Sequence, residues 1–286
     1  MCEVSQSSTG SYDQPPQPIP VKLPVFAIVA GAYEAMYDDC FAFLKLAAIP
    51  FGLLVYISVI ELLAETGQVV GGALAVSILL EFTAVVLLSF LWCRRLLPPA
   101  ERRHPSALRC FLWYLLCGLF LYLIVAALLF VWMFAAVSVW LWLIELVPAA
   151  SVLVQIGPAL ISVLGIALVF FMTARFLPVF PGVAIGTSVT FRAAWFAMEG
   201  NAWRVMAAFL FAAAPVMLIT LLLLSLVPTD VAVVSSLAIG VNAFTQAAVW
   251  VVGLGASAGV AAAVFQSVRE HLPGARPLQL KLPGIT

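Results

Sequence analysis

Long apolar runs dominate the chain, and short segments holding Pro, Gly and charged side chains separate them. A helix needs about 20 mostly apolar residues to cross the hydrocarbon core of a bilayer. The whole chain is 65% hydrophobic and 9% charged, whereas a soluble domain averages about 25% charged residues. The sequence therefore predicts an all-α fold, a polytopic membrane helix bundle with six transmembrane helices. We expect them at residues 44–64, 70–93, 109–133, 152–174, 204–227 and 239–267.

The third run is too long for a single upright span. From Phe111 to Ile144 it holds no charge, and as one straight helix it would be about 50 Å long. Its middle has no Gly, Pro or polar cluster to form a hairpin. We therefore expect the span to end near Met133. The residues that follow would lie along the outer interface, where Trp140 and Trp142 suit the headgroup region.

Charge sorting predicts the orientation. In this arrangement all 13 Lys and Arg fall on one side of the membrane, and the opposite loops carry only the acids Glu65, Glu145 and Asp230. Cytoplasmic loops are enriched in Lys and Arg, so we expect both termini in the cytoplasm. Residues 1–24 then form a disordered cytoplasmic tail, 25–268 a six-span membrane domain and 269–286 a second cytoplasmic tail. The zero net charge argues against a nucleic-acid partner.

Two amphipathic segments precede the first and fifth spans. Residues 25–40 place Phe26, Val29, Ala32, Tyr33 and Met36 on one helical face, and residues 187–200 have a similar character. We expect both to be interfacial helices that lie in the membrane plane. Their sequences also align, Ala32 to Met36 with Ala194 to Met198, and Asp39 with Asn201. This alignment raises the hypothesis of a parallel internal repeat.

The stretch from Arg175 to Arg204 resembles a group of bacterial six-span inner-membrane proteins of uncharacterised function. That group is similar to the membrane domain of glycerophosphoryl diester phosphodiesterases. The resemblance implies a helix bundle in the bacterial inner membrane and no agreed activity, and no segment here can hold the catalytic domain of those enzymes. The motif in this cytoplasmic loop consists of Arg175, Leu177, Pro178, Trp195, Gly200, Asn201, Trp203 and Arg204.

Within that motif, Gly200 and Asn201 are expected to separate the interfacial helix from the fifth span. Gly lowers helix propensity, and Asn201 is a candidate N-cap that accepts from the N–H of Trp203 or Arg204. A contact of Asn201 with a lipid or partner is the alternative. The spacing of Gly255 and Gly259 in the last span predicts close packing between helices.

One acid, Glu81, lies in the middle of a span, and such a group normally turns toward the bundle interior. Four hydroxyl residues lie at a comparable distance, twelve or thirteen residues from a cation at the inner end of their span. At 1.5 Å per residue, that is about 18–20 Å. These positions predict an intramembrane polar layer, either a structural hydrogen-bond cluster or a proton- or substrate-coupling site. Its members are Glu81, Ser58, Tyr122, Ser162 and Ser257.

No motif indicates catalysis, a cofactor or a metal, because the two histidines are isolated in loops and the cysteines lack ligand spacing. We therefore expect a non-enzymatic scaffold or interaction module. Its partners would be the lipid bilayer and either a protein partner or a second copy of the chain. The alternative is a small-molecule or lipid transporter that uses Glu81; a membrane-embedded lipid enzyme is a third hypothesis.

Overall fold

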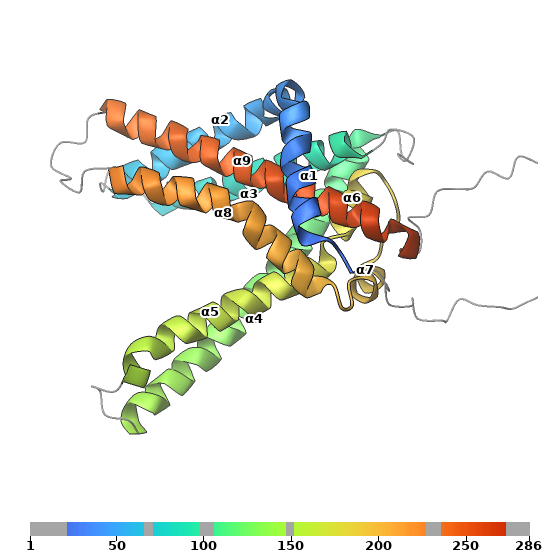
Figure 1. Ribbon diagram of the computed structural model, residues 1–286. Helices are drawn as coiled ribbons and strands as arrows, with labels where there is room; N and C mark the ends of the chain where they lie inside the picture. The colour runs from blue at the N-terminus through green and yellow to red at the C-terminus, as the bar shows by residue number, and fades with distance from the viewer. Residues whose placement is uncertain (1–21, 66–70, 98–105, 147–151, 227–235, 273–286) are drawn as a thin grey trace, which may run out of the picture.

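The structure is a computed structural model, and it describes residues 22–65, 71–97, 106–146, 152–226 and 236–272. Throughout these ranges every regular element is helical. Six of the helices are long and apolar enough to cross a membrane, which confirms the all-α fold with six membrane-length helices (Figure 1). The predicted tails before residue 22 and after residue 272, and the predicted outer acid Asp230, lie outside the described residues.

Each predicted span coincides with one long helix to within a few residues, except the third. The long helices are α2 (Cys40–Glu65), α3 (Gly71–Leu96), α4 (Ala107–Leu146), α5 (Val152–Phe176), α8 (Ala202–Leu226) and α9 (Ser236–Val268). The shorter elements are α1 (Val25–Asp38), α6 (Val179–Ala184), α7 (Phe191–Ala197) and the 3-10 turn η3 (Arg269–His271). Pro215 lies inside α8, and Figure 1 shows that helix bending along its length, as an internal proline requires.

Helix α9 forms the centre of the main bundle, where it contacts α1, α2, α3 and α8. Two glycines of α9, Gly255 and Gly259, make this possible, because a side chain at either position would collide with a neighbouring helix. An added Cβ on Gly255 would lie 2.6 Å from the Phe43 ring, and one on Gly259 would lie 2.8 Å from Cβ of Ala32. The close packing predicted from the Gly255 and Gly259 spacing is therefore confirmed.

Helices α4 and α5 pair with each other and diverge from the main bundle (Figure 1). We call this pair the α4–α5 arm. Two indoles of α4 pack on glycines of α5, Trp140 on Gly157 and Trp132 on Gly165. The Trp132 indole N–H also donates to the Ile161 carbonyl at 3.2 Å. Little else covers the arm: 6% of its most apolar stretch is buried in each helix, against 56% in α9.

The predicted end of the third span near Met133 is wrong. Helix α4 continues without a break to Leu146, because the charge-free run contains no helix breaker and Trp140 packs on α5 rather than lying apart along an interface. The apolar stretch Ala107–Trp142 has 36 residues and is about 54 Å long at 1.5 Å per residue. A helix longer than the hydrocarbon thickness fits by tilting, and the arm is inclined to the bundle in Figure 1.

Of the two predicted interfacial segments, the first forms a longer helix than the second. Helix α1 lies across α8 and α9 (Figure 1) and buries Ile28, Ala32 and Met36. Phe26, predicted on the same face as Ala32 and Met36, is 71% exposed, and its ring centroid lies 5.1 Å from that of Phe211 on α8. The second segment is helical only over α7, because Thr190 caps that helix by accepting from the Ala193 N–H. Placement of α1 and α7 in the membrane plane stays a prediction.

Candidate functional site

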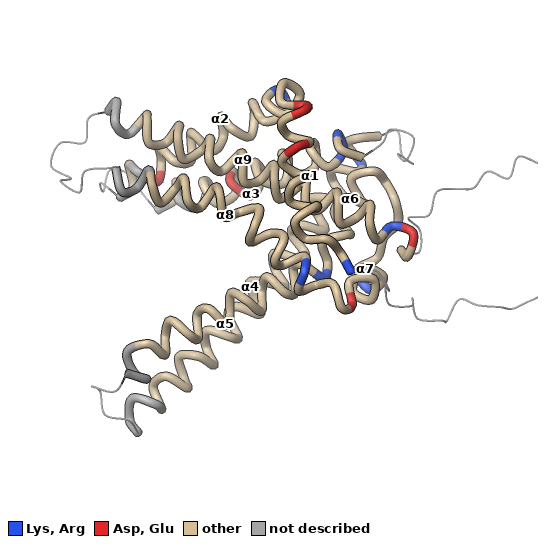
Figure 2. Tube along the Cα trace, in the orientation of Figure 1, with Lys and Arg blue, Asp and Glu red and all other residues tan. Residues whose placement is uncertain are grey.

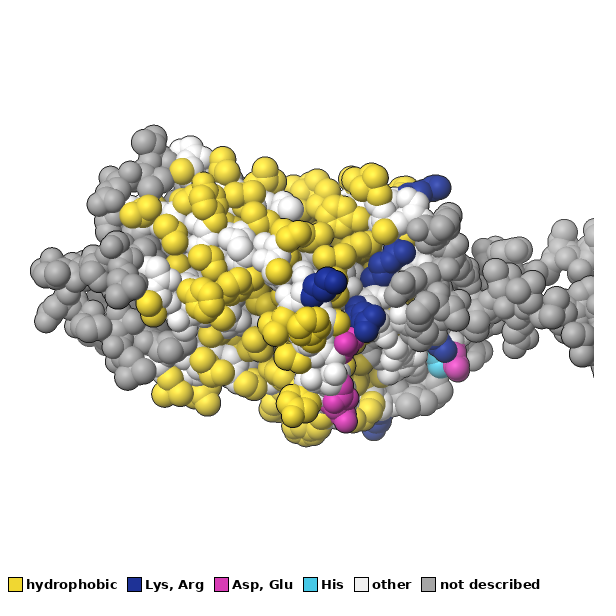
Figure 3. Space-filling view, turned by 90° about the horizontal axis from the view of Figure 1, so that it is seen from above, with side chains coloured by type: hydrophobic (Ala, Val, Ile, Leu, Met, Phe, Trp, Pro, Cys, Tyr) yellow, Lys and Arg dark blue, Asp and Glu magenta, His cyan; other side chains and the backbone are white. Residues whose placement is uncertain are grey.

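The Lys and Arg residues of the described ranges gather toward one end of the molecule, where α6 and α7 lie, whereas the acids Glu61 and Glu81 lie along α2 and α3 in the bundle (Figure 2). Figure 2 shows the Lys and Arg of the described ranges at this end and none along the far half of the bundle or the arm. In the face drawn in Figure 3, apolar side chains cover the part away from these charges. We call this the cation-bearing end. It contains the loop motif that the sequence singled out.

Arg175, at the end of α5, is held between aromatic rings. Its guanidinium carbon lies 4.4 Å from the centroid of the Trp195 ring and 5.2 Å from that of Phe171. Its Nε is buried with no hydrogen-bond partner, so stacking is the contact that holds this side of the guanidinium. Arg175 and Trp195, twenty residues apart in the motif, therefore join α5 to α7. Pro178 is buried and precedes α6 as its N-cap.

Gly200 and Asn201 separate α7 from α8, as the sequence predicted. Gly200 has φ of +77°, in the left-handed region that favours glycine. Asn201 is 3% exposed, and its side-chain oxygen accepts from the Leu23 N–H at 3.2 Å. The predicted capping bond to Trp203 or Arg204 stays a prediction. The bond to Leu23 could not be read from the sequence, because 178 residues separate its two ends.

A second side chain, Arg204, also bonds the backbone of Leu23, and we call the two bonds from Asn201 and Arg204 the clasp on Leu23. One guanidinium nitrogen of Arg204 donates to the Leu23 carbonyl at 3.2 Å, so Asn201 and Arg204 together hold the N–H and the C=O of one peptide residue. Leu23 itself is 3% exposed. Leu23, which the sequence assigned to the tail 1–24, thus packs on the bundle, and the tail before residue 22 lies outside the described residues. Trp203, the remaining member of the motif, is 65% exposed.

Beyond the clasp, Tyr33 anchors α1 on α8. Its hydroxyl donates to the Ala212 carbonyl at 2.6 Å. Burial raises the pKa of Tyr33, because the ionised phenolate would lose hydration there. At the other end of α1, Asp39 accepts from Nε of Arg95 at 2.7 Å. Asp39 and Asn201, aligned in the hypothetical repeat, therefore both hold distant parts of the chain, although by different contacts.

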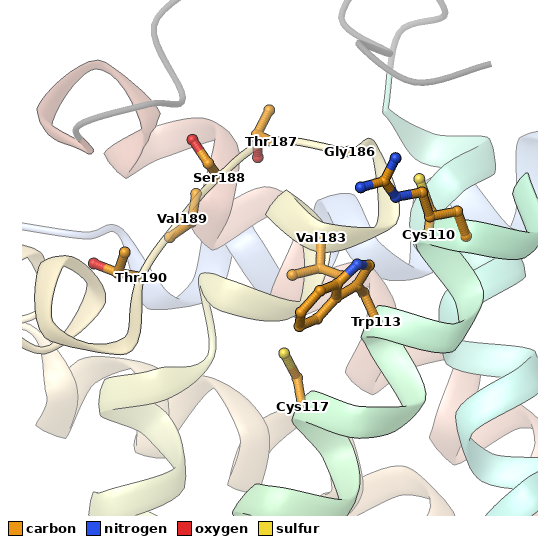
Figure 4. A pocket seen from close by; sticks show the side chains of 10 residues that line it. Cys110, Trp113, Cys117, Val183, Gly186, Thr187, Ser188, Val189 and Thr190 are labelled. Atoms are coloured by element: carbon orange, nitrogen blue, oxygen red, sulfur yellow. The ribbon is translucent and has the colours of Figure 1, made fainter. Parts of the chain in front are cut away.

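A pocket opens at the cation-bearing end between the start of α4, α6 and the loop that leads to α7. It has a volume of about 460 Å³. In Figure 4, Trp113, Cys117 and Val183 face a common space, and the side chains of Ser188 and Thr190 point away from Trp113. Arg109 and Cys110 also line it. The sequence placed Arg109 among the cations of one side of the membrane but did not predict the pocket, because its loop wall carries no recognisable motif.

The predicted polar layer does not form as a whole. Glu81 and Tyr122 line one pocket of about 410 Å³ between α3 and α4, together with Phe82, Val85 and Leu119. The Ser162 hydroxyl, on an exposed part of α5, donates to its own helix at the Pro158 carbonyl. The Ser257 hydroxyl likewise donates to the Gly253 carbonyl at 2.8 Å.

Ser58 is buried on α2, at 6% exposure, and no described contact joins it to Glu81. A serine in a helix can bond the carbonyl four residues earlier, and equal depth along several helices therefore does not bring hydroxyls together. The pocket at Glu81 and Tyr122 bears on the transport alternative.

Among the described residues, no group of His, Cys, Asp and Glu is arranged to hold a metal ion. No family model, no curated protein and no solved structure matches the chain. Six helices of the described ranges are long and apolar enough to cross a membrane, which is the character of a membrane protein.

Proposed function

We propose that the protein is a non-enzymatic scaffold or interaction module of the bacterial inner membrane, with both termini in the cytoplasm. The location is supported by the resemblance of the Arg175 to Arg204 stretch. The orientation is supported by the gathering of Lys and Arg at the cation-bearing end (Figure 2), since such residues favour the cytoplasmic side. Binding, rather than chemistry, is supported by the α4–α5 arm.

The observation that carries this proposal is the exposure of the apolar side chains of the α4–α5 arm. Phe130 and Phe134 on α4 are 75% and 72% exposed, and most of the arm beyond its root has no neighbour other than its own partner helix (Figure 1). A bilayer can cover such an apolar face. Lipid tails, however, do not fix the angle of a helix pair; packing against neighbouring helices does.

One face of the arm suits helix docking. Ala127, Val131 and Ala135 follow one another at intervals of four residues on α4, and all three are exposed. Residues four apart lie on the same side of a helix, and small residues let two membrane helices approach closely. The arm therefore offers a face with two alanines, Ala127 and Ala135, on either side of Val131 to a transmembrane helix of a partner protein. We expect that helix to set the inclination of the arm.

Photocrosslinking in native membranes tests this function. A photoreactive amino acid at Val131, which is 65% exposed, should capture another protein. The same amino acid at Ile49 on α2, which is 70% exposed, serves as the matched control and should capture lipid alone. Lipid adducts alone from Val131, or equal protein adducts from both positions, would contradict a docking role for the arm.

A further inference from the structure

The pocket at the cation-bearing end has apolar walls and a polar rim. Its apolar wall comes from Trp113 and Cys117 of α4 and from Val183 of α6, which face one another across the space in Figure 4. Val189 of the loop adds to it and is itself 7% exposed. A volume of about 460 Å³ lies in the range of small-molecule sites. Such a wall suits a hydrocarbon chain rather than a free ion.

The loop wall of this pocket is preformed. The Thr187 hydroxyl and the Thr187 N–H both lie within hydrogen-bond distance of the Gly182 carbonyl, at 2.8 and 2.9 Å. A Cβ on Gly182 would lie 2.8 Å from a methyl of Val189, so the loop packs directly on α6. Gly186 makes the turn with φ of +80°. A ligand would therefore find the wall in place and would not have to order it.

Arg109 supplies a cation at the pocket without an acidic partner among the described residues. Its side chain is exposed, and its described hydrogen bond is made by its backbone N–H to Ser106. Neighbouring cations of the same end are engaged elsewhere. Arg94 donates to the Ala184 carbonyl at 3.3 Å, and Arg175 stacks on Trp195. Arg109 is thus placed to meet an anion at the mouth of an apolar pocket.

We propose that this pocket binds an anionic phospholipid from the leaflet at the cation-bearing end. Its acyl chain would lie against Trp113, Cys117 and Val183, and its phosphate would pair with Arg109. Basic pockets between transmembrane helices on the cytoplasmic side bind anionic headgroups, and Trp113 is 55% exposed, as an aromatic residue at the headgroup level would be. This site is separate from the docking face of the arm.

Crosslinking with a lipid probe tests the site. The full chain is placed in nanodiscs of phosphatidylcholine that contain phosphatidylglycerol with a photoreactive acyl chain, and adducts are mapped by peptide mass spectrometry. We expect adducts on residues 109–117 and 183–190. Arg109→Gln should reduce them about fivefold, since one Lys or Arg near an anionic surface contributes about 1 kcal/mol. Arg192→Gln removes an exposed cation of α7 outside the pocket and should leave them unchanged.

Two further variants ensure that the test does not depend on whether the Arg109→Gln variant folds. Arg109→Lys should retain most adducts because it keeps the charge. Val183→Trp fills the pocket while Arg109 remains, and should remove adducts from residues 109–117 in protein that elutes as a single species. The proposal fails if Arg109→Gln and Arg192→Gln behave alike, or if Val183→Trp has no effect. It also fails if inorganic phosphate displaces the lipid probe, since the site would then recognise a free anion.

Discussion

At the residue scale, Gly200 shows how one backbone angle sets a local boundary. Helix α7 ends at Ala197 and α8 begins at Ala202, and the chain turns between them at a φ of +77°. No atom lies within 4 Å of a Cβ built on Gly200. Any cost of a side chain there comes from the backbone angle and not from crowding. Since Asn201 follows Gly200 directly, the turn also positions the Asn201 side chain to accept from the Leu23 N–H.

Gly200→Ala should therefore destabilise the protein by about 1–2 kcal/mol, the cost of a left-handed conformation for an L-residue. Gly52→Ala is the matched control, because Gly52 lies inside α2 with no atom within 4 Å of a Cβ, and alanine favours a helix. Thermal unfolding in detergent should show a lower Tm for Gly200→Ala and an equal or higher Tm for Gly52→Ala. Equal Tm values for Gly200→Ala and the natural protein would contradict a strained turn.

At the element scale, the contact between α1 and α9 depends on a missing side chain. A Cβ on Gly259 would lie 2.8 Å from Cβ and 3.2 Å from Cα of Ala32, and neither atom can move unless helix α1 moves. Gly259→Val should therefore push α1 off α9 and cost about 1–3 kcal/mol, as overpacking does.

Hydrogen exchange measures that loss locally. Gly259→Val should speed amide exchange in residues 25–38 far more than in α2. Gly240→Val is the control, since Gly240 lies in α9 with no atom within 4 Å of a Cβ. Equal acceleration in both variants would mean that α1 does not rest on Gly259.

An element could be predicted from the sequence where it depends on neighbouring residues, and could not where it depends on a contact with a distant segment. The six long helices could be predicted because each depends on a local run of apolar residues, and the Gly255 and Gly259 contact because close approach needs small residues on one helix. The end of α4 could not, because it depends on Trp140 packing against Gly157 of another helix. The clasp on Leu23 and the pocket at Arg109 likewise join segments that are distant in sequence. Of the predicted polar layer, Glu81 and Tyr122 share one pocket, whereas the hydroxyls of Ser162 and Ser257 donate to carbonyls of their own helices.

At the scale of the whole molecule, the main bundle and the α4–α5 arm meet at the cation-bearing end and diverge from there (Figure 1). The main bundle is packed around α9, whereas the α4–α5 arm leaves it at an incline (Figure 1). The length of α4 allows an incline, because the 36-residue apolar stretch, about 54 Å long, exceeds the hydrocarbon thickness of about 30 Å; the angle itself is set by packing against a neighbouring helix. The docking face of the arm and the pocket at Arg109 then face different surroundings, the bilayer interior and the headgroup region.

The docking face of the arm and the pocket at Arg109 both require that α4 cross the membrane once, as a single helix. Labelling of single cysteines in the full chain, with the native cysteines replaced, measures this directly. Ser106→Cys lies before α4 and Glu145→Cys near its end. A membrane-impermeant maleimide applied to intact spheroplasts should label Glu145→Cys alone, and should label Ser106→Cys only after the membrane is opened. Labelling of both positions, or of neither, from the same side would contradict the account.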